Sequence, residues 1–598
     1  MGRLGLHSWV LWCALCLSLT IGPARAEPVS SFVVPGASDE LADELRGASL
    51  TLAALEQSTT DPADLVSAAL ADYRRLVETL YASGHYSGSV RIRLNGREAA
   101  DIPLLSLPAR IDRIAIEVAP GPLFRFGAVS VTPVAPGTAL VDGFRPGEPA
   151  RATLIRAATQ AVISGWRDAG HAKAEPGTQR IVADHRAQTL SADIRVIPGP
   201  QVRFGELNVT GPSAVRASRL RRISGLPEGE IFSPSTVSQV GTRLRRTGTF
   251  SSVTLEEGAV NPDGTMDIDL TVVDRMPRRY GFGAELSSRE GLDLSAFWMH
   301  RNLFGGAERL RIEGEIAQIG GQDGDPDFLL GARLDFPAAV GADTNFFLMT
   351  ELERLDERRF RSDRFEIGAG VTWYARDGLE AEAAVTYLRS ETEDALGTRD
   401  FSLLTFPTSV SWDRRDDALN PTVGTYLRVE ATPYLGLSGS ATGARAFVDA
   451  RGYRGLNNGR FVLAGRLQLG SIMGSSLRET YPDFLFFSGG GGTVRGQPFQ
   501  SLEVDLGGGQ ATGGRSFMGA MVELRAGLTD TLGAVLFTDA GYVGPESFVN
   551  GAGEWHAGAG IGLRYDTGIG PIRVDVAAPV HGDTGDGVQV YIGIGQAF

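Results

Sequence analysis

The second half of the chain alternates apolar and polar residues in short stretches that Gly, Asp, Asn and Pro separate. In the first stretch one face carries Tyr280, Phe282, Ala284 and Leu286, and the other carries Arg279, Gly281, Gly283 and Glu285. Successive side chains of a strand point to opposite faces, so the alternation predicts β-structure from about residue 276 to residue 598. Such strands suit either a soluble sandwich with its apolar side chains inside or a membrane barrel with them facing lipid.

The length of this region and its last residue favour the membrane barrel, as does the signal peptide described next. Residues 276–598 number 323, which makes about 16 strands if each strand with its connection takes roughly 20 residues. The final stretch ends on Phe598, and aromatic residues line the membrane interfaces of such barrels. The sequence therefore predicts an all-β transmembrane barrel of 16 antiparallel strands over residues 276–598.

Residues 1–26 have the features of a secretory signal peptide. Arg3 supplies a positive start, the stretch from Trp9 to Ile21 is apolar, and Ala24-Arg25-Ala26 fits a cleavage site. The apolar stretch is shorter than the roughly 20 residues that a membrane-spanning helix needs. No other stretch of the sequence is long and apolar enough, so a closed barrel is the expected way into a membrane.

Composition and motifs exclude several classes of function. Lys and Arg number 57 against 71 Asp and Glu, which argues against a nucleic-acid partner because phosphate binding needs clustered cations. Both cysteines, Cys13 and Cys16, lie in the expected signal peptide, so neither disulfides nor thiolate metal sites are expected. The sequence has no nucleophile elbow and no phosphate-binding loop. We therefore expect no enzymatic activity, no cofactor and no metal.

Two acidic clusters allow a second interpretation. They are Asp413 with Asp416 and Asp417, and Asp583 with Asp586. Oxygen-rich loops of this kind can bind Ca²⁺ weakly, but solvated turns are the simpler interpretation.

A repeat divides the first 275 residues. Gly-Pro, Arg-Phe-Gly and Val-Thr follow one another from Gly121 and again from Gly199, a period of 199 − 121 = 78 residues. In the second copy the pattern predicts strand, helix, helix, strand and strand, with a helix that begins at Pro234 and stops before Gly248. A fainter relative spans about residues 28–118. The expected organisation is a signal peptide at 1–26, three α+β modules at 27–119, 120–198 and 199–275, and the barrel at 276–598.

The glycine-rich run from Gly489 to Gly496 carries the strongest resemblance to a known family. Its Val494-Arg495-Gly496 resembles the loop-six motif of the BamA/TamA outer-membrane assembly factors, although Gln497 stands where that family has an aromatic residue. Phe499 is a candidate replacement for that aromatic. Further similarity is found at 300–305, 413–421 and 595–598. The resemblance implies POTRA modules ahead of a 16-stranded barrel, and three modules are similar to TamA, the translocation and assembly module.

An arginine that enters a barrel lumen needs an acidic partner. The family's partner motif, F-x-D-x-G, is matched by Phe537-Thr538-Asp539-Ala540-Gly541, which makes Asp539 the expected partner of Arg495. Glu523 is a second candidate because Val522 and Leu524 occupy the opposite face of its strand. An exposed loop without such a pair is the simpler alternative.

The seam between the first and last strands is the second candidate site. Gly281 and Gly283 lie in the first strand, and Gly593 and Gly595 are expected in the last, which ends at Phe598. Glycines weaken strand pairing, so the seam could part sideways; alternatively, they fit a crowded lumen.

The resemblance implies a function and partners for these sites. A client's terminal strand would pair at the seam and leave laterally into outer-membrane lipid, so that autotransporter-type and other barrel proteins assemble. The implied partner is a TamB-like, inner-membrane-anchored protein that reaches the POTRA modules in the periplasm of a Gram-negative cell. The alternatives are a two-partner-type secretion pore and a passive porin or structural barrel.

Overall fold

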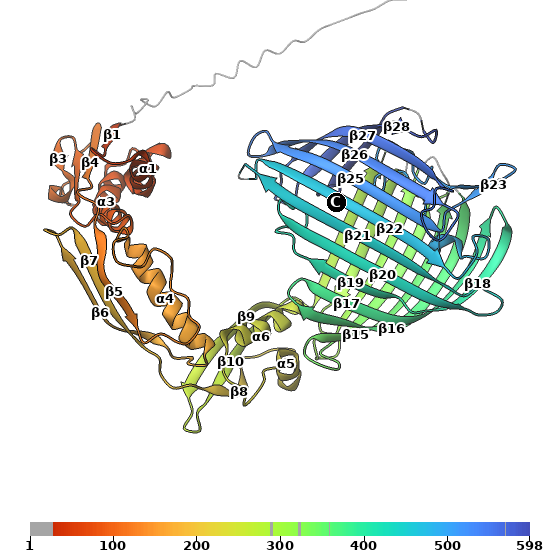
Figure 1. Cartoon of the computed structure of the whole chain (residues 1–598), viewed down its shortest axis with the longest axis horizontal. Helices are drawn as coiled ribbons and strands as arrows, with labels where there is room; N and C mark the ends of the chain where they lie inside the picture. Colours follow the sequence, from red (N-terminus) through yellow and green to blue (C-terminus); the bar gives the residue numbers. More distant parts are fainter. Residues whose placement is uncertain are drawn as a thin grey trace, which may run out of the picture. The chain divides into compact units, whose positions relative to one another are not determined.

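The structure is a computed structural model that describes residues 28–103, 105–287, 291–320, 325–357, 359–457, 459–568, 570–585 and 587–598 (Figure 1). The expected signal peptide, 1–26, lies outside the described residues. Among the helices of the described ranges, none is long and apolar enough to cross a membrane. The chain divides into two compact units, which are described in turn.

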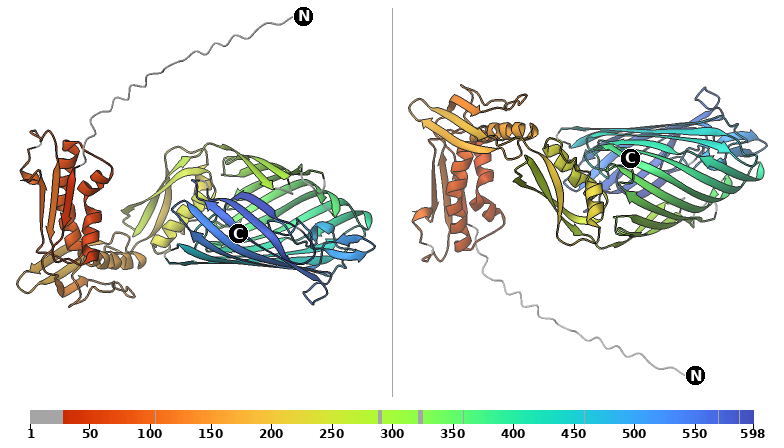
Figure 2. Two further views of the ribbon diagram at one scale, coloured as in Figure 1. Left: turned by 90° about the horizontal axis from the view of Figure 1, so that it is seen from above. Right: turned by 90° about the horizontal axis from the view of Figure 1, so that it is seen from below.

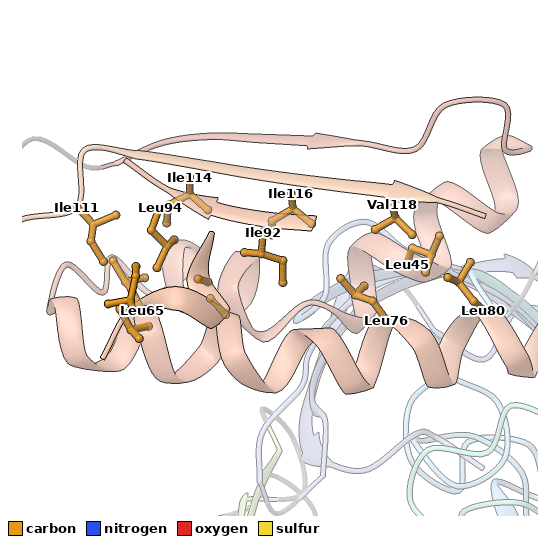
Figure 3. Close-up of a cluster of buried hydrophobic side chains, with 14 of the residues drawn as sticks. Leu45, Leu65, Leu76, Leu80, Ile92, Leu94, Ile111, Ile114, Ile116 and Val118 are labelled. Atoms are coloured by element: carbon orange, nitrogen blue, oxygen red, sulfur yellow. The ribbon is translucent and has the colours of Figure 1, made fainter. Parts of the chain in front are cut away.

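The first module has three helices against a four-stranded sheet. Its elements are β1 (Val29–Val33), α1 (Asp39–Ala48), α2 (Leu50–Glu56), α3 (Pro62–Ala82), β2 (Ser89–Leu94), β3 (Arg97–Glu98), the short 3-10 helix η1 (Ala99–Asp101) and β4 (Arg113–Ala119), with sheet order β1-β4-β2-β3. Leu65, Leu76 and Leu80 of α3 pack against Ile92 and Ile116 of the sheet (Figure 3). The 3.6-residue period of α3 and the alternation of the strands together make this core.

The second module has a three-stranded sheet and one helix. Its elements are β5 (Arg125–Thr132), α4 (Ala152–Asp168), β6 (Glu175–Asp184) and β7 (Thr189–Ile197), in the order β5-β7-β6. The segment that would match the first helix of the repeat, 133–151, is irregular. Its four prolines and three glycines explain the difference, because both residue types destabilise helices.

The third module has the order of elements that the sequence predicts. Its elements are β8 (Arg203–Thr210), α5 (Ala217–Ser224), α6 (Pro234–Arg246), β9 (Phe250–Val260) and β10 (Thr265–Asp274), in the order β8-β10-β9. Helix α6 begins at Pro234 as predicted, and Gly248 turns the chain with a φ of +69°. Three POTRA-like α+β modules thus precede the barrel.

From β11 onward the strands close into a barrel (Figures 1 and 2). They are β11 (Arg278–Ser287), β12 (Gly291–His300), β13 (Arg309–Ile319), β14 (Asp327–Pro337), β15 (Thr344–Glu357), β16 (Phe360–Arg376), β17 (Leu379–Asp394), β18 (Gly397–Thr405), β19 (Thr408–Asp413), β20 (Gly424–Gly436), β21 (Gly443–Leu456), β22 (Phe461–Met473), β25 (Ser516–Gly527), β26 (Leu532–Gly544), β27 (Glu554–Tyr565), β28 (Ile572–His581) and β29 (Gln589–Ile594). Strands β18 and β19 both pair with β17 and β20 on either side of Pro407, so they form one crossing. Counted this way, the described strands make the 16 antiparallel crossings predicted.

The side chains of the barrel decide between the sandwich and the membrane barrel. Ile312 and Ile316 of β13 point outward and are exposed, as is Ile561 of β27. Arg309 on the opposite face of β13 forms an ion pair with the buried Asp335. Apolar side chains therefore cover the outside and charges pair inside, which is the arrangement of a barrel in lipid.

The third module docks on the barrel at the turn between β14 and β15 through arginines. Arg219 Nη2 donates to the carbonyl of Pro337 at 2.6 Å. Arg243 donates from Nε and Nη2 to the two carboxylate oxygens of Asp343, at 3.0 and 2.6 Å. Asp343 lies in the turn between β14 and β15, and the hydrogen bonds from Arg243 lower its pKa. The third module and the barrel accordingly belong to one compact unit.

We expect Asp343→Asn to loosen this docking by about 1 kcal/mol, the upper end for a partly exposed ion pair. Because the pKa of Asp343 is lowered on docking, the contribution is present at neutral pH and is lost as the pH falls through this lowered pKa. Hydrogen exchange of α6 at neutral pH measures the effect. Asp530→Asn changes an exposed aspartate in the turn between β25 and β26 and is the matched control; equal exchange in both variants would contradict the prediction.

Candidate functional site

The connection between β22 and β25, residues 474–515, folds into the lumen; we call it loop six. It carries a small hairpin of β23 (Val504–Gly507) and β24 (Gln510–Thr512) and the short 3-10 helix η2 (Pro482–Phe484). The sharp turn at its tip depends on Gly489 and Gly496, whose φ angles are +116° and +91°. A Cβ on Gly496 would overlap the backbone of Ala578, so the tip lies directly against β28.

Arg495 at this tip is buried, with 1% of its side chain exposed. Its Nε and Nη2 donate to the two oxygens of Asp539 at 2.8 and 3.0 Å, and its backbone N–H donates to the same carboxylate at 3.1 Å. Its Nη1 donates to Glu523 at 2.7 Å and to Asp575 at 3.2 Å. The guanidinium lies 3.6 Å from the ring centroid of Phe537. Bidentate, fully buried pairs of this kind are strong and direction-specific.

Two further arginines complete a charge-balanced cluster. Arg525 Nε donates to Glu523 at 2.8 Å, and Arg564 Nη2 donates to Asp575 at 3.3 Å. Three guanidinium groups therefore face three carboxylates, and all six side chains are buried. We call these six residues the lumen cluster: Arg495, Glu523, Arg525, Asp539, Arg564 and Asp575.

The structure brings Arg495 together with both partners that the sequence suggested, Asp539 and Glu523. Sequence reasoning missed Asp575, Arg525 and Arg564. A signal for Asp575 existed, because it lies on the polar face of the alternating stretch 572–578. Alternation predicts which residues of a strand face the lumen, but it does not predict which residues of other strands they meet there.

Gln497, which replaces the family's aromatic residue, binds the barrel wall through its amide. Its Nε2 donates to the carbonyls of Ala557 and His581 at 2.8 and 3.0 Å, and its Oε1 accepts from Thr584 at 2.8 Å. Phe499 is half-buried and borders a cavity that Phe360 and Phe517 also line and Arg495 does not. The aromatic ring against Arg495 is thus Phe537, not Phe499.

The seam between β11 and β29 is weakly paired. Within the described residues, β11 pairs with β29 at Leu286–Ile592 and Ser287–Tyr591 alone, whereas it pairs with β12 along its whole length. Residues 278–285 are all described, and none of them pairs with β29. A row of backbone donors and acceptors on β11 therefore lacks a neighbouring strand.

The predicted seam residues lie in different places. Gly281 and Gly283 are in β11, and a Cβ on Gly281 would overlap the ring of Phe297, so this glycine makes room in the lumen. Gly593 is in β29. The placement of Gly595 and Phe598 in the last strand was wrong: β29 ends at Ile594, and Phe598 is buried in the lumen because Gly595, with a φ of +89°, turns the chain inward.

The acidic cluster of Asp413, Asp416 and Asp417 has local partners. Asp413 accepts from Arg415, and Asp416 accepts from the backbone N–H groups of Thr422 and Val423. The hydroxyl of Thr422 donates to Asp416 as well. The hydrogen bonds from Thr422 and Val423 shape the turn between β19 and β20 and lower the pKa of Asp416 to about 2. In the other cluster, Asp586 lies outside the described residues.

Comparison with known proteins identifies the barrel and the third module. Residues 302–598 match the Omp85 superfamily domain, and residues 202–275 match the POTRA family, described as a surface antigen variable number repeat. The outer membrane protein assembly factor BamA of Neorickettsia risticii (strain Illinois) is 23% identical over 434 residues, which are 67% of this chain and 56% of that protein. The chain thus spans little more than half the length of this relative.

Two solved structures share the fold. BamA from Haemophilus ducreyi lacking POTRA domains 1–3 has a TM-score of 0.60 at 17% identity and covers 78% of this chain and 99% of its own. CdiB from Acinetobacter baumannii has a TM-score of 0.50 at 10% identity and covers 79% and 89%. Because residues 302–598 match the Omp85 superfamily domain and residues 202–275 match the POTRA family, the chain belongs to the Omp85 superfamily, as a barrel of the Gram-negative outer membrane with POTRA modules in the periplasm.

Proposed function

We propose that the protein is a TamA-like assembly factor that inserts unfolded β-barrel clients, including autotransporters, into the outer membrane through the β11–β29 seam. The observation that carries this proposal is the unpaired edge of β11 along residues 278–285. An extended client segment adds to such an edge through backbone hydrogen bonds, which makes recognition tolerant of client sequence.

The lumen beside this edge supports the proposal. A cavity of about 1180 Å³ lies there, lined in part by Gly283 of β11, Ser295 of β12 and Glu353 of β15. Loop six occupies another part of the lumen, where Arg495 binds the carboxylates of the lumen cluster. A client strand at the seam therefore has space on the lumen side, while loop six stays anchored.

We further propose that the POTRA modules receive a TamB-like partner or the client by the same edge chemistry. Strand β6 is an edge strand of the second module, and its Ile181 and Val182 are exposed. Folding of the client supplies the free energy in this proposal, so neither an enzymatic step nor a cofactor is needed.

The deciding experiment reconstitutes the protein in liposomes with an unfolded barrel client. We expect folded, protease-resistant client to accumulate in these vesicles and not in empty ones, without steady ion conductance. Conductance without client folding would instead indicate a passive porin, and passage of a soluble protein into the vesicle would indicate a secretion pore.

A second arm of the experiment deletes residues 27–274. If the barrel alone inserts the client at a reduced rate, the seam performs the insertion and the modules deliver the client. Full insertion without the modules would contradict the delivery role proposed for them.

A further inference from the structure

Residues 595–598, which we call the lumenal segment, leave the barrel wall and enter the lumen. In the three views of Figures 1 and 2 the C label falls within the outline of the barrel. Gly595 N donates to the carbonyl of Pro571 at 2.7 Å, and Gln596 N donates to that of Leu419 at 3.0 Å. Phe598 packs in a buried cluster with Tyr453, Ala464 and Met521, and Ala597 packs against this cluster.

Two arginines of the lumen cluster hold this segment. Arg525 Nη2 donates to the backbone oxygen of Phe598 at 3.1 Å, and Arg564 Nε donates to Oε1 of Gln596 at 2.7 Å. The guanidinium of Arg525 also lies 5.7 Å from the ring centroid of Phe598. Arg525 Nε also donates to Glu523, and Arg564 Nη2 donates to Asp575; both carboxylates bind Arg495 as well. Arg525 Nη1 donates to the carbonyl of Pro421 at 3.2 Å. The lumen cluster thus anchors loop six and the lumenal segment together.

The position of the segment decides whether the edge of β11 is available. The register Leu286–Ile592, continued by antiparallel pairing, would place Ala284 opposite Ile594 and Gly283 opposite Gly595. An extended lumenal segment would therefore lie along the edge that is unpaired in this structure. Its inward turn keeps that edge open.

We propose that Arg525 and Arg564 are positioning residues that hold the lumenal segment inside the barrel and so keep the β11 edge free for a client strand. The inference rests on the proposed function, because it concerns the edge at which the client pairs. When the arginines release the segment, it pairs with β11 and competes with the client.

Cross-linking measures the position of the segment without any client. Ala464→Cys with Ala597→Cys places two thiols in one buried cluster, and a short bifunctional maleimide joins them while the segment is inside. We expect efficient cross-linking in the full-length protein and a roughly tenfold lower yield after Arg525→Gln with Arg564→Gln, since charge-assisted hydrogen bonds are lost. Arg333→Gln, which removes a lumenal arginine bound to Glu382, is the control and should leave the yield unchanged.

A matched variant releases the segment without touching the arginines. At Gly595 the nearest atom to an added Cβ is 3.6 Å away, so space allows a methyl group. The φ of +89°, however, disfavours any residue with a side chain. We expect Gly595→Ala to lower the cross-linking yield in the same direction as the arginine substitutions.

The rate of client insertion then shows whether Arg525 and Arg564 position the lumenal segment or only stabilise the barrel. We expect Arg525→Gln with Arg564→Gln to slow insertion, and truncation after Ile594 in the same protein to restore it, because no segment remains to occupy the edge. A structural role for the arginines predicts no such rescue. If the shortened chain fails to fold, the cross-linking yield alone decides.

An unchanged cross-linking yield in the arginine variant, or a folded truncation that does not restore insertion, would overturn the inference. Failure of the proposed function gives a different result. In that case the unsubstituted protein inserts no client, while the cross-linking experiment still reports where the segment lies.

Discussion

Arg495→Ala will free loop six from the lumen and lower the free energy of unfolding of the barrel by about 3–5 kcal/mol, the range for breaking one member of a buried ion pair. The substitution leaves three carboxylates facing two arginines. One buried negative charge then lacks compensation, and burial of an unpaired charge is costly. Loop six also loses the backbone and side-chain hydrogen bonds to Asp539 that hold its tip.

Protease digestion of folded protein in detergent measures the position of loop six, and the temperature at which the barrel unfolds measures stability. We expect cleavage within residues 474–515 in Arg495→Ala and none in the parent. Arg478→Ala, an exposed arginine of the same loop, should behave like the parent. Client insertion should fall together with the protection of loop six.

A double substitution separates charge balance from anchoring. Arg495→Ala with Asp539→Asn leaves two arginines facing two carboxylates, so we expect it to recover part of the lost stability. Loop six should nevertheless remain sensitive to protease, because its anchor is still missing. Equal protease resistance in Arg495→Ala and the parent would show that Arg495 does not hold the loop.

A disulfide across the seam should abolish client insertion reversibly. Leu286 and Ile592 are opposite one another in the register of β11 and β29, and directly opposed strand residues have Cβ atoms about 4.5–5.5 Å apart. Leu286→Cys with Ile592→Cys in the mature chain should therefore cross-link on oxidation with modest backbone adjustment. We expect insertion below about one-tenth of the reduced level, because a closed seam cannot admit a strand.

The control places the same bond elsewhere in the wall. Val429 of β20 and Val448 of β21 are opposite one another in their register, so Val429→Cys with Val448→Cys tests disulfide formation away from the seam. This variant should insert clients equally well when oxidised and when reduced. Full activity of the oxidised seam variant would mean that clients do not pass between β11 and β29.

Much of the fold follows from local pattern. The alternation in 280–286 and in the later stretches is enough to predict strands, and the 78-residue repeat is enough to predict modules. Both signals depend only on residues that are close together in the sequence. The second module shows the limit of the repeat: the prolines and glycines of 133–151 remove a helix that its neighbour has. A repeat aligns positions, whereas local composition decides whether each element forms.

The site was partly predictable. Arg495 and Asp539 stood out through short motifs, and Glu523 through its place on an inward face. Asp575, Arg525 and Arg564 were missed. The polar face of 572–578 marks Asp575 as inward, but no single stretch shows which residues meet across the lumen, because those contacts join separate strands. Phe598 also belongs to the end of an alternating stretch, yet one left-handed glycine sends it into the lumen.

Periodicity and motif thus account for the strands, the three modules and the arginine at the tip of loop six, since these depend on residues close together in the chain. Which face of each strand meets lipid, which charges share the lumen cluster and where the wall stays unpaired depend on the closure of the barrel. Closure brings residues as far apart as Leu286 and Ile592 into register. That pairing is a long-range contact, and neither short segment specifies its partner.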